Sequence, residues 1–161
     1  MLFRSISEPE YFGLRSYLKT QNLFGLDYIY STLSNSDGAD ALDYEKLMTN
    51  PSEFVIVSTD AETGKTKYFH KNDMKKDDYS IIKASCALPA ACHPVEIDGH
   101  FYYDGGVSDS IPVKKALTDG CEKIVIIMSK NRDFVKKPES MRMFYSLKCR
   151  RYPKVIALLN T

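Results

Sequence analysis

The chain has 161 residues, of which 43% are apolar and 12% aromatic, and its 22 basic and 21 acidic side chains leave a net charge of +1. This composition is typical of one globular domain, and it argues against intrinsic disorder and against nucleic-acid binding by phosphate neutralisation. A membrane-spanning helix is excluded as well, because the longest apolar runs, such as Ile124–Met128, are far shorter than the ~20 residues that cross a bilayer.

Short helices are predicted for the first third of the chain. The segment from Ser7 to Glu10 has a capping residue and, in Pro9, a first-turn proline. Apolar side chains then recur at helical spacing, at Tyr11, Leu14 and Leu18. Two more short helices are expected over Leu26–Leu33 and Tyr44–Met48.

The middle of the chain alternates between strand and helix patterns. Glu53–Thr59 is rich in β-branched residues and apolar on both faces, which is typical of a central, covered strand. Lys67–His70 is expected to return beside it after a turn. A helix capped by Asp77 or Asp78 should follow and end before Pro89.

A β-hairpin is the strongest local signal. Asp98-Gly99 separates two short apolar runs, Val95–Ile97 and His100–Tyr103, and this dipeptide favours a two-residue hairpin turn. Beyond it we expect a helix over Val113–Leu117, a buried parallel strand over Lys123–Ser129 and a basic, apolar helical tail over 136–161 that Pro153 divides. Helices alternating with strands predict a layered α/β domain in which antiparallel pairing is the minority.

Cysteine usage and the N-terminus bear on compartment. The four cysteines form no C-x-x-C pair, and the cluster of Cys86, Cys92, His93 and His100 is interpreted as buried thiols and loop histidines, without a metal or other cofactor. The first residues lack the apolar stretch of a signal peptide. We therefore expect free thiols and a cytoplasmic protein.

A carboxylate followed directly by two glycines stands out among the candidate functional residues. Asp104 ends a predicted strand, where α/β sheets place their sites, and Gly105 and Gly106 allow another element to approach closely. Taken alone, the triplet is also compatible with an ordinary turn.

The surrounding segment resembles the patatin-like phospholipases, a family of serine acyl hydrolases. The resemblance rests on an ordered series: Ala84-Ser85, Pro89, His93-Pro94-Val95, Gly99, Tyr102-Tyr103, Asp104-Gly105-Gly106 and Pro112-Val113. It covers about residues 10–135, and it implies a three-layer α/β/α sheet, related to that of the α/β hydrolases, with a β-hairpin near Asp104. Ser110 stands where the family commonly has Asn, and we expect it to cap the helix that begins at Pro112.

Two family motifs are missing from the sequence. Neither a G-x-S-x-G nucleophile elbow nor a G-G-G-x-[RK]-G oxyanion loop occurs, and the nearest approach, at Ser108, has a serine in place of the last glycine. In the family both motifs lie N-terminal to the matched region. The expectation is therefore that residues 1–161 form a single partial domain, a fragment without its nucleophile.

The resemblance implies a Ser–Asp dyad in which Asp104 accepts the proton of the nucleophilic serine while Gly105 and Gly106 shape the site. The reaction would be hydrolysis of a lipid or acyl ester through an acyl-enzyme. Because such a dyad needs no histidine, His93 and His100 are interpreted as structural, as is Ser85.

Other interpretations stay open at this stage. The chain is either part of a lipid acyl hydrolase or a non-catalytic patatin-like interaction module that has lost its elbow, and an unrelated α/β binding domain is a weaker possibility. An exposed sheet edge would favour homo-oligomers. The basic tail would allow either peripheral membrane contact or packing as a core helix with solvated charges. No nucleic-acid partner is expected.

Overall fold

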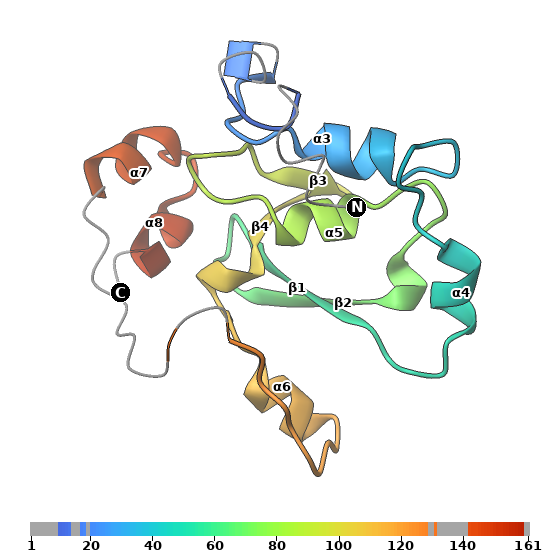
Figure 1. The fold of residues 1–161 in the computed structure, drawn as a ribbon. Coiled ribbons are helices and arrows are strands. Elements are labelled where there is room, and N and C mark those ends of the chain that lie inside the picture. Colours follow the sequence, from blue (N-terminus) through green and yellow to red (C-terminus); the bar gives the residue numbers. More distant parts are fainter. Residues whose placement is uncertain (1–9, 14–16, 19, 129–130, 132–141, 160–161) are drawn as a thin grey trace.

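A computed structural model describes residues 10–13, 17–18, 20–128, 131 and 142–159. Its centre is a four-stranded sheet in the order β2-β1-β4-β3 (Figure 1). The strands are β1 (Val55–Asp60), β2 (Thr66–His70), β3 (Val95–Ile97) and β4 (His100–Asp104). The helices are α3 (Leu26–Tyr28), which continues as the π-helix η1 (Ile29–Leu33), α4 (Tyr44–Thr49), η2 (Lys71–Asp73), α5 (Ser80–Ser85), η3 (Gly105–Val107), α6 (Val113–Thr118), α7 (Arg142–Lys148) and α8 (Pro153–Leu159).

The α/β fold class is confirmed, but the pairing of the strands differs from the expectation. All the strand pairs in the described residues are antiparallel, so the prediction that antiparallel pairing is the minority was wrong. The turns explain the difference. Thr66 returns to Thr59 across a short turn, and Asp98 and Gly99 have φ of 50° and 79°, as the mirror-image hairpin turns require.

The two faces of the sheet follow from the register. Ile56 pairs with Phe69 and Asp60 with Tyr102, and side chains of such pairs share a face. The ring of Phe69 meets that of Tyr102 edge-on at 5.2 Å. Helix α5 packs across β1, β3 and β4, with Ile81 and Ala84 buried.

The C-terminal tail packs onto the sheet. The ring of Tyr152 lies 5.8 Å from that of Tyr103, edge-on, and Cys149 and Val155 are fully buried. Four basic side chains of the described part of this segment are exposed: Lys148, Arg150, Arg151 and Lys154. The predicted division at Pro153 is confirmed, since this residue begins α8.

The N-terminal helix differs from its prediction within the described residues. Residues 10–13 form a turn, with Phe12 in an isolated bridge to Phe24, instead of a helix through Tyr11. Gly13 has a φ of 124°, which no α-helix accommodates, so the helical residues come later, at Tyr17, Leu18 and Thr20. The expected start at Ser7 and Pro9 lies outside the described residues.

The predicted strand over Lys123–Ser129 is also wrong where the structure describes it. Residues 123–128 have no regular secondary structure and are exposed; Val125 and Ile127 expose 87% and 94% of their surface. An extended segment becomes a strand only beside another strand, and none of the described strands runs along it. Together with α6 it projects away from the sheet (Figure 1).

Within the described residues, no helix reaches the length and apolar character that crossing a bilayer requires.

Candidate functional site

Asp104 is held in place through its backbone at the end of the central hairpin. Its N–H donates to the carbonyl of Ala87, after α5, at 2.9 Å. Its own carbonyl accepts the hydroxyl of Thr59, in β1, at 2.8 Å. Asp104 thus ends β4 and is hydrogen-bonded both to β1 and to the segment after α5. These backbone contacts fix the position from which its side chain extends.

Each of the two glycines after Asp104 has its own structural role. A Cβ on Gly105 would lie 2.3 Å from the carbonyl oxygen of Val57, so only glycine allows η3 to pass this close to β1. The N–H of Gly106 donates to Oδ1 of Asp104 at 2.7 Å, and the carboxylate thereby caps η3. Among the described residues, the remaining oxygen, Oδ2, accepts no hydrogen bond.

Burial and this hydrogen bond act on the Asp104 carboxyl in opposite directions. Desolvation raises its pKa above the ordinary value, and the N–H of Gly106 lowers it by a smaller amount. Desolvation prevails, so the pKa is raised and the carboxylate is a better proton acceptor than a solvated aspartate.

Two hollows open on either side of Asp104 and Gly106. The larger, a cleft of about 430 Å³, is also lined by Ile82, Ser85 and Asp109 and by residues 54–57 at the start of β1. The smaller, of about 250 Å³, lies towards Pro89 and α8. Reacting groups can therefore reach the carboxyl from two directions.

Ser108 belongs to a network of hydroxyl groups behind Asp104. Its Oγ lies 2.8 Å from Oγ1 of Thr59 and accepts the hydroxyl of Thr66 at 3.0 Å. Thr59 is fully buried and also binds the carbonyl of Asp104, so this network supports the loop that carries the carboxyl.

The other residues considered from sequence lie at varied positions. Ser85 ends α5 and lines the larger cleft together with Asp104. His100 starts β4, whereas Asp104 ends it, and His93 is exposed, with its N–H bonded to Asn22. Ser110 gives α6 no side-chain cap, contrary to the expectation, because Pro112 occupies the cap position.

The cysteines are free thiols, as expected. In the part of the chain that the structure describes, no group of three or more His, Cys, Asp and Glu side chains is placed to hold a metal ion.

Sequence analysis missed the residues that support Asp104 from a distance. Thr59 and Ala87 belong to elements that are 45 and 17 positions away, so their contacts depend on tertiary structure. A signal existed only for Thr59, a polar residue near the end of an otherwise apolar strand pattern.

Comparison with known proteins relates this chain to one family of hydrolases. A family model described as patatin-like phospholipase matches residues 2–117. The uncharacterized protein YjjU of Escherichia coli K12 is 26% identical over 128 residues, which are 79% of this chain and 35% of that protein. The uncharacterized NTE family proteins Rv1063c of Mycobacterium tuberculosis and Mb1092c of Mycobacterium bovis are each 33% identical over 63 residues, 39% of this chain and 16% of theirs. The chain thus spans about a third of the length of YjjU and less of the mycobacterial proteins.

Proposed function

Because the chain belongs to the patatin-like phospholipase family, we propose that it carries the aspartate half of a lipid acyl hydrolase and that Asp104 is the proton acceptor of a Ser–Asp dyad. One observation carries the proposal: the Asp104 carboxyl is partly desolvated at a strand end, between two hollows, with one oxygen bound by Gly106. The nucleophilic serine, in this proposal, comes from a segment outside these 161 residues.

The proposed reaction is a two-step acyl transfer. Asp104 accepts the proton of the serine hydroxyl while Oγ forms a bond to the ester carbonyl carbon. The ester C–O bond then breaks as Asp104 gives this proton to the leaving alcohol oxygen. In the second step Asp104 accepts a proton from water as the water oxygen bonds to the acyl carbon, the acyl–Oγ bond breaks, the proton returns to Oγ, and free acid and serine are released. Gly105 and Gly106 allow the serine to approach Asp104 as closely as this geometry needs.

We also propose that the protein acts in the cytoplasm.

A longer chain in which residues 1–161 follow a G-x-S-x-G segment provides the test. We expect it to hydrolyse p-nitrophenyl esters and the variant Asp104→Ala to lose roughly 10²–10⁴-fold in kcat, the usual contribution of a general base. The matched control is Asp109→Ala, which removes another carboxylate from the same cleft. The Asp109 carboxylate accepts the hydroxyl of Tyr68. Activity retained in Asp104→Ala would refute the dyad assignment.

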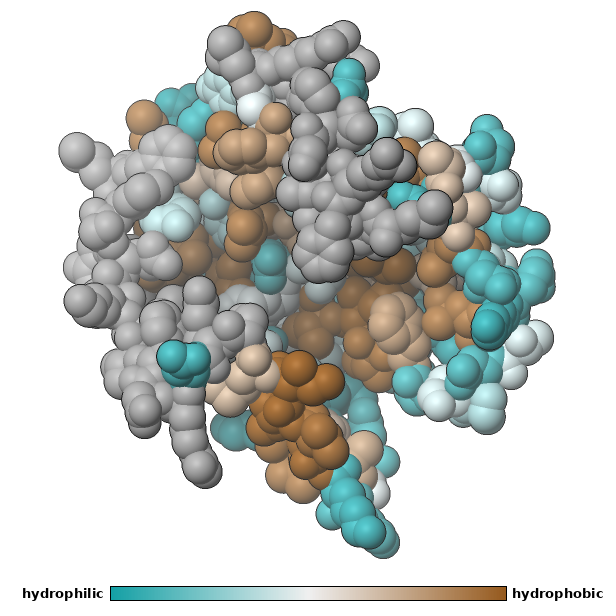
Figure 2. All heavy atoms as spheres, in the orientation of Figure 1, coloured by the Kyte–Doolittle hydropathy of each residue, from teal (hydrophilic) through white to brown (hydrophobic). Residues whose placement is uncertain are grey.

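One observation favours a second candidate function, that of an interaction module. The apolar segment Ile124–Met128 is exposed, and Figure 2 shows apolar atoms gathered near the base of the projecting α6 arm. An interaction module would bind a protein partner through this segment, and its binding would be unaffected by Asp104→Ala.

A further inference from the structure

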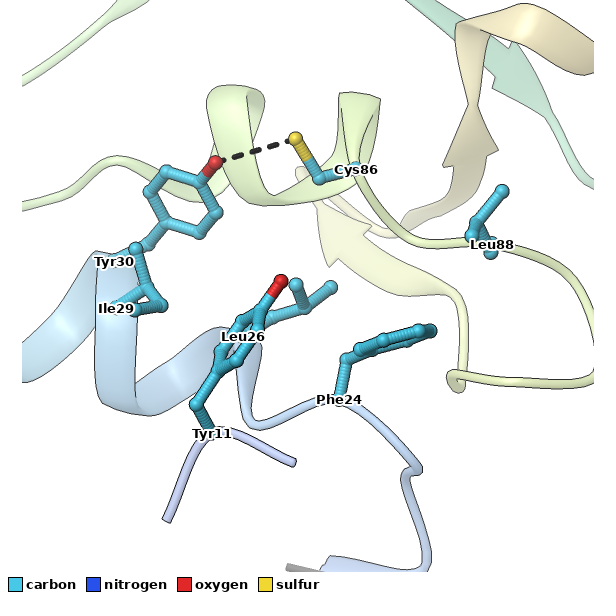
Figure 3. A pocket seen from close by; sticks show the side chains of 7 residues that line it. All are labelled: Tyr11, Phe24, Leu26, Ile29, Tyr30, Cys86 and Leu88. Atoms are coloured by element: carbon cyan, nitrogen blue, oxygen red, sulfur yellow. Dashed lines mark hydrogen bonds between the residues drawn. The ribbon is translucent and has the colours of Figure 1, made fainter. Parts of the chain in front are cut away.

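A third pocket, which is apolar, lies on the other side of the segment that binds Asp104. Its walls come from the turn before α3, from α3 and η1, and from the end of α5 (Figure 3). It is lined by Tyr11, Phe24, Leu26, Ile29, Tyr30, Cys86 and Leu88.

The pocket offers no charge to a ligand. The polar side-chain atoms of its lining residues are two phenol hydroxyls and one thiol, and the hydroxyl of Tyr30 lies 3.2 Å from Sγ of Cys86 (Figure 3). Burial raises the pKa of Tyr30, and it does the same for Cys86 and Tyr11. All three groups are therefore neutral near pH 7, and a charged headgroup would lose its hydration without gaining a partner.

The volume of the pocket limits what it holds. It measures about 160 Å³, close to the ~150 Å³ apolar cavity that accommodates one benzene molecule. A neutral apolar group of about six carbons fills this space.

The pocket is joined to Asp104 by three consecutive residues. The carbonyl of Ala87 accepts the N–H of Asp104. The two neighbours of Ala87, Cys86 and Leu88, each line the apolar pocket and one of the hollows beside Asp104. Cys86 lines the apolar pocket and the larger Asp104 cleft, and Leu88 lines the apolar pocket and the smaller hollow. Cys86 and Leu88 are therefore walls that the apolar pocket shares with the hollows beside Asp104.

We propose that this pocket binds the end of an unbranched acyl chain, about six carbons of it, and that the ester carbonyl of the same chain lies at Asp104. The acyl assignment rests on the proposed function, whereas binding of a neutral six-carbon aliphatic group does not. Ile29, Leu26 and Leu88 form the aliphatic wall, and the ring of Phe24 closes it.

Binding is tested on the 161-residue chain itself, without hydrolysis, by NMR of ¹³C-labelled Ile and Leu methyl groups titrated with methyl hexanoate. We expect saturable shifts at Leu26, Ile29 and Leu88, and weaker binding of methyl acetate. The variant Ile29→Phe fills the pocket and should weaken binding by at least about tenfold. Ile127→Phe, the same change at a side chain that is 94% exposed, should leave binding unchanged.

A second variant keeps the test valid if Ile29→Phe does not fold. Leu88→Ala alters a side chain that is 45% exposed, enlarges the pocket and should shift the preference from methyl hexanoate to methyl octanoate. Shifts confined to Ile124–Met128, or binding insensitive to both variants, would overturn the proposal. If these methyl shifts appear while Asp104→Ala leaves hydrolysis by the longer chain intact, the binding site stands and the proposed function fails.

Discussion

Gly105 shows how one backbone position controls the geometry of the site. The carboxyl of Asp104 is oriented by the chain that follows it, and that chain touches β1 at Val57 with no room for a side chain. Neither Val57 nor Asp104 can move to make room for a side chain at Gly105. Val57 lies in the central strand β1, and Asp104 is hydrogen-bonded to Thr59 and Ala87.

The variant Gly105→Ala should therefore lower the free energy of unfolding by about 1–3 kcal/mol, the usual cost of overpacking. Gly106→Ala is the matched control: its Cβ would lie 3.0 Å from Oδ1 of Asp104 and 4.0 Å from Cβ of Ser110, and we expect a smaller loss of stability. Urea denaturation of both variants measures the difference. Equal stability of Gly105→Ala and the unmodified chain would contradict the close approach of η3 to β1.

The raised pKa of Asp104 makes a prediction about stability and pH. Folding favours its protonated form, so this contribution to stability is fully present below the unfolded pKa and is lost as pH rises through the folded pKa. Asp104→Asn is neutral throughout and keeps an acceptor for the N–H of Gly106. Its free energy of unfolding, relative to the unmodified chain, should increase from pH 3 to pH 7.

Asp77 provides a control of opposite sign. The N–H of Ser36, followed by the Ser36 hydroxyl, lowers its pKa, so its contribution is present above the unfolded pKa and lost as pH falls through the folded pKa. Asp77→Asn should therefore lose stability, relative to the unmodified chain, as pH rises over the same window. Urea denaturation across this range tests both, and the same sign for the two variants would contradict the assignment.

Among the elements, those with local signals were the most predictable from sequence. The hairpin of β3 and β4 and its Asp98-Gly99 turn are confirmed, because a dipeptide with positive φ determines them. The return of β2 beside β1 is confirmed as well, because a short turn joins Thr59 to Thr66 and such turns also have a local sequence signal. The segment 123–128 was predicted wrongly. Its apolar pattern indicates that these side chains favour burial, but it does not show which strand would pair with the segment.

The exposed segment Ile124–Met128 should make the chain self-associate, as unpartnered apolar segments do. We expect the double variant Val125→Lys, Ile127→Lys to remain monomeric at concentrations where the unmodified chain forms oligomers, with an unfolding free energy changed by no more than about 0.5 kcal/mol. Leu117→Lys, at another exposed apolar position, is the control. Light scattering measures the masses; unchanged association in the double variant would assign the interface to another surface.

For the molecule as a whole, the ordered motif from Ala84 to Val113 predicted the family, and the family model confirms it. The candidate site was predictable only in its linear part, Asp104-Gly105-Gly106. The contacts of Asp104 with Thr59 and Ala87 and the apolar pocket behind Cys86 come from tertiary packing, which no local pattern encodes. The single partial domain over 1–161, with its region of family resemblance at about 10–135 and its C-terminal segment 136–161, stays a prediction.

The central claim is that Asp104 serves a serine that these 161 residues do not contain. Treatment of the chain with a fluorophosphonate probe, followed by mass spectrometry of its peptides, tests this claim most directly. We predict that no serine is labelled and that p-nitrophenyl esters are not hydrolysed, since the Ser108 hydroxyl is held by Thr59 and Thr66. Stoichiometric labelling of Ser108 or Ser85 would contradict the claim and identify a nucleophile within the chain.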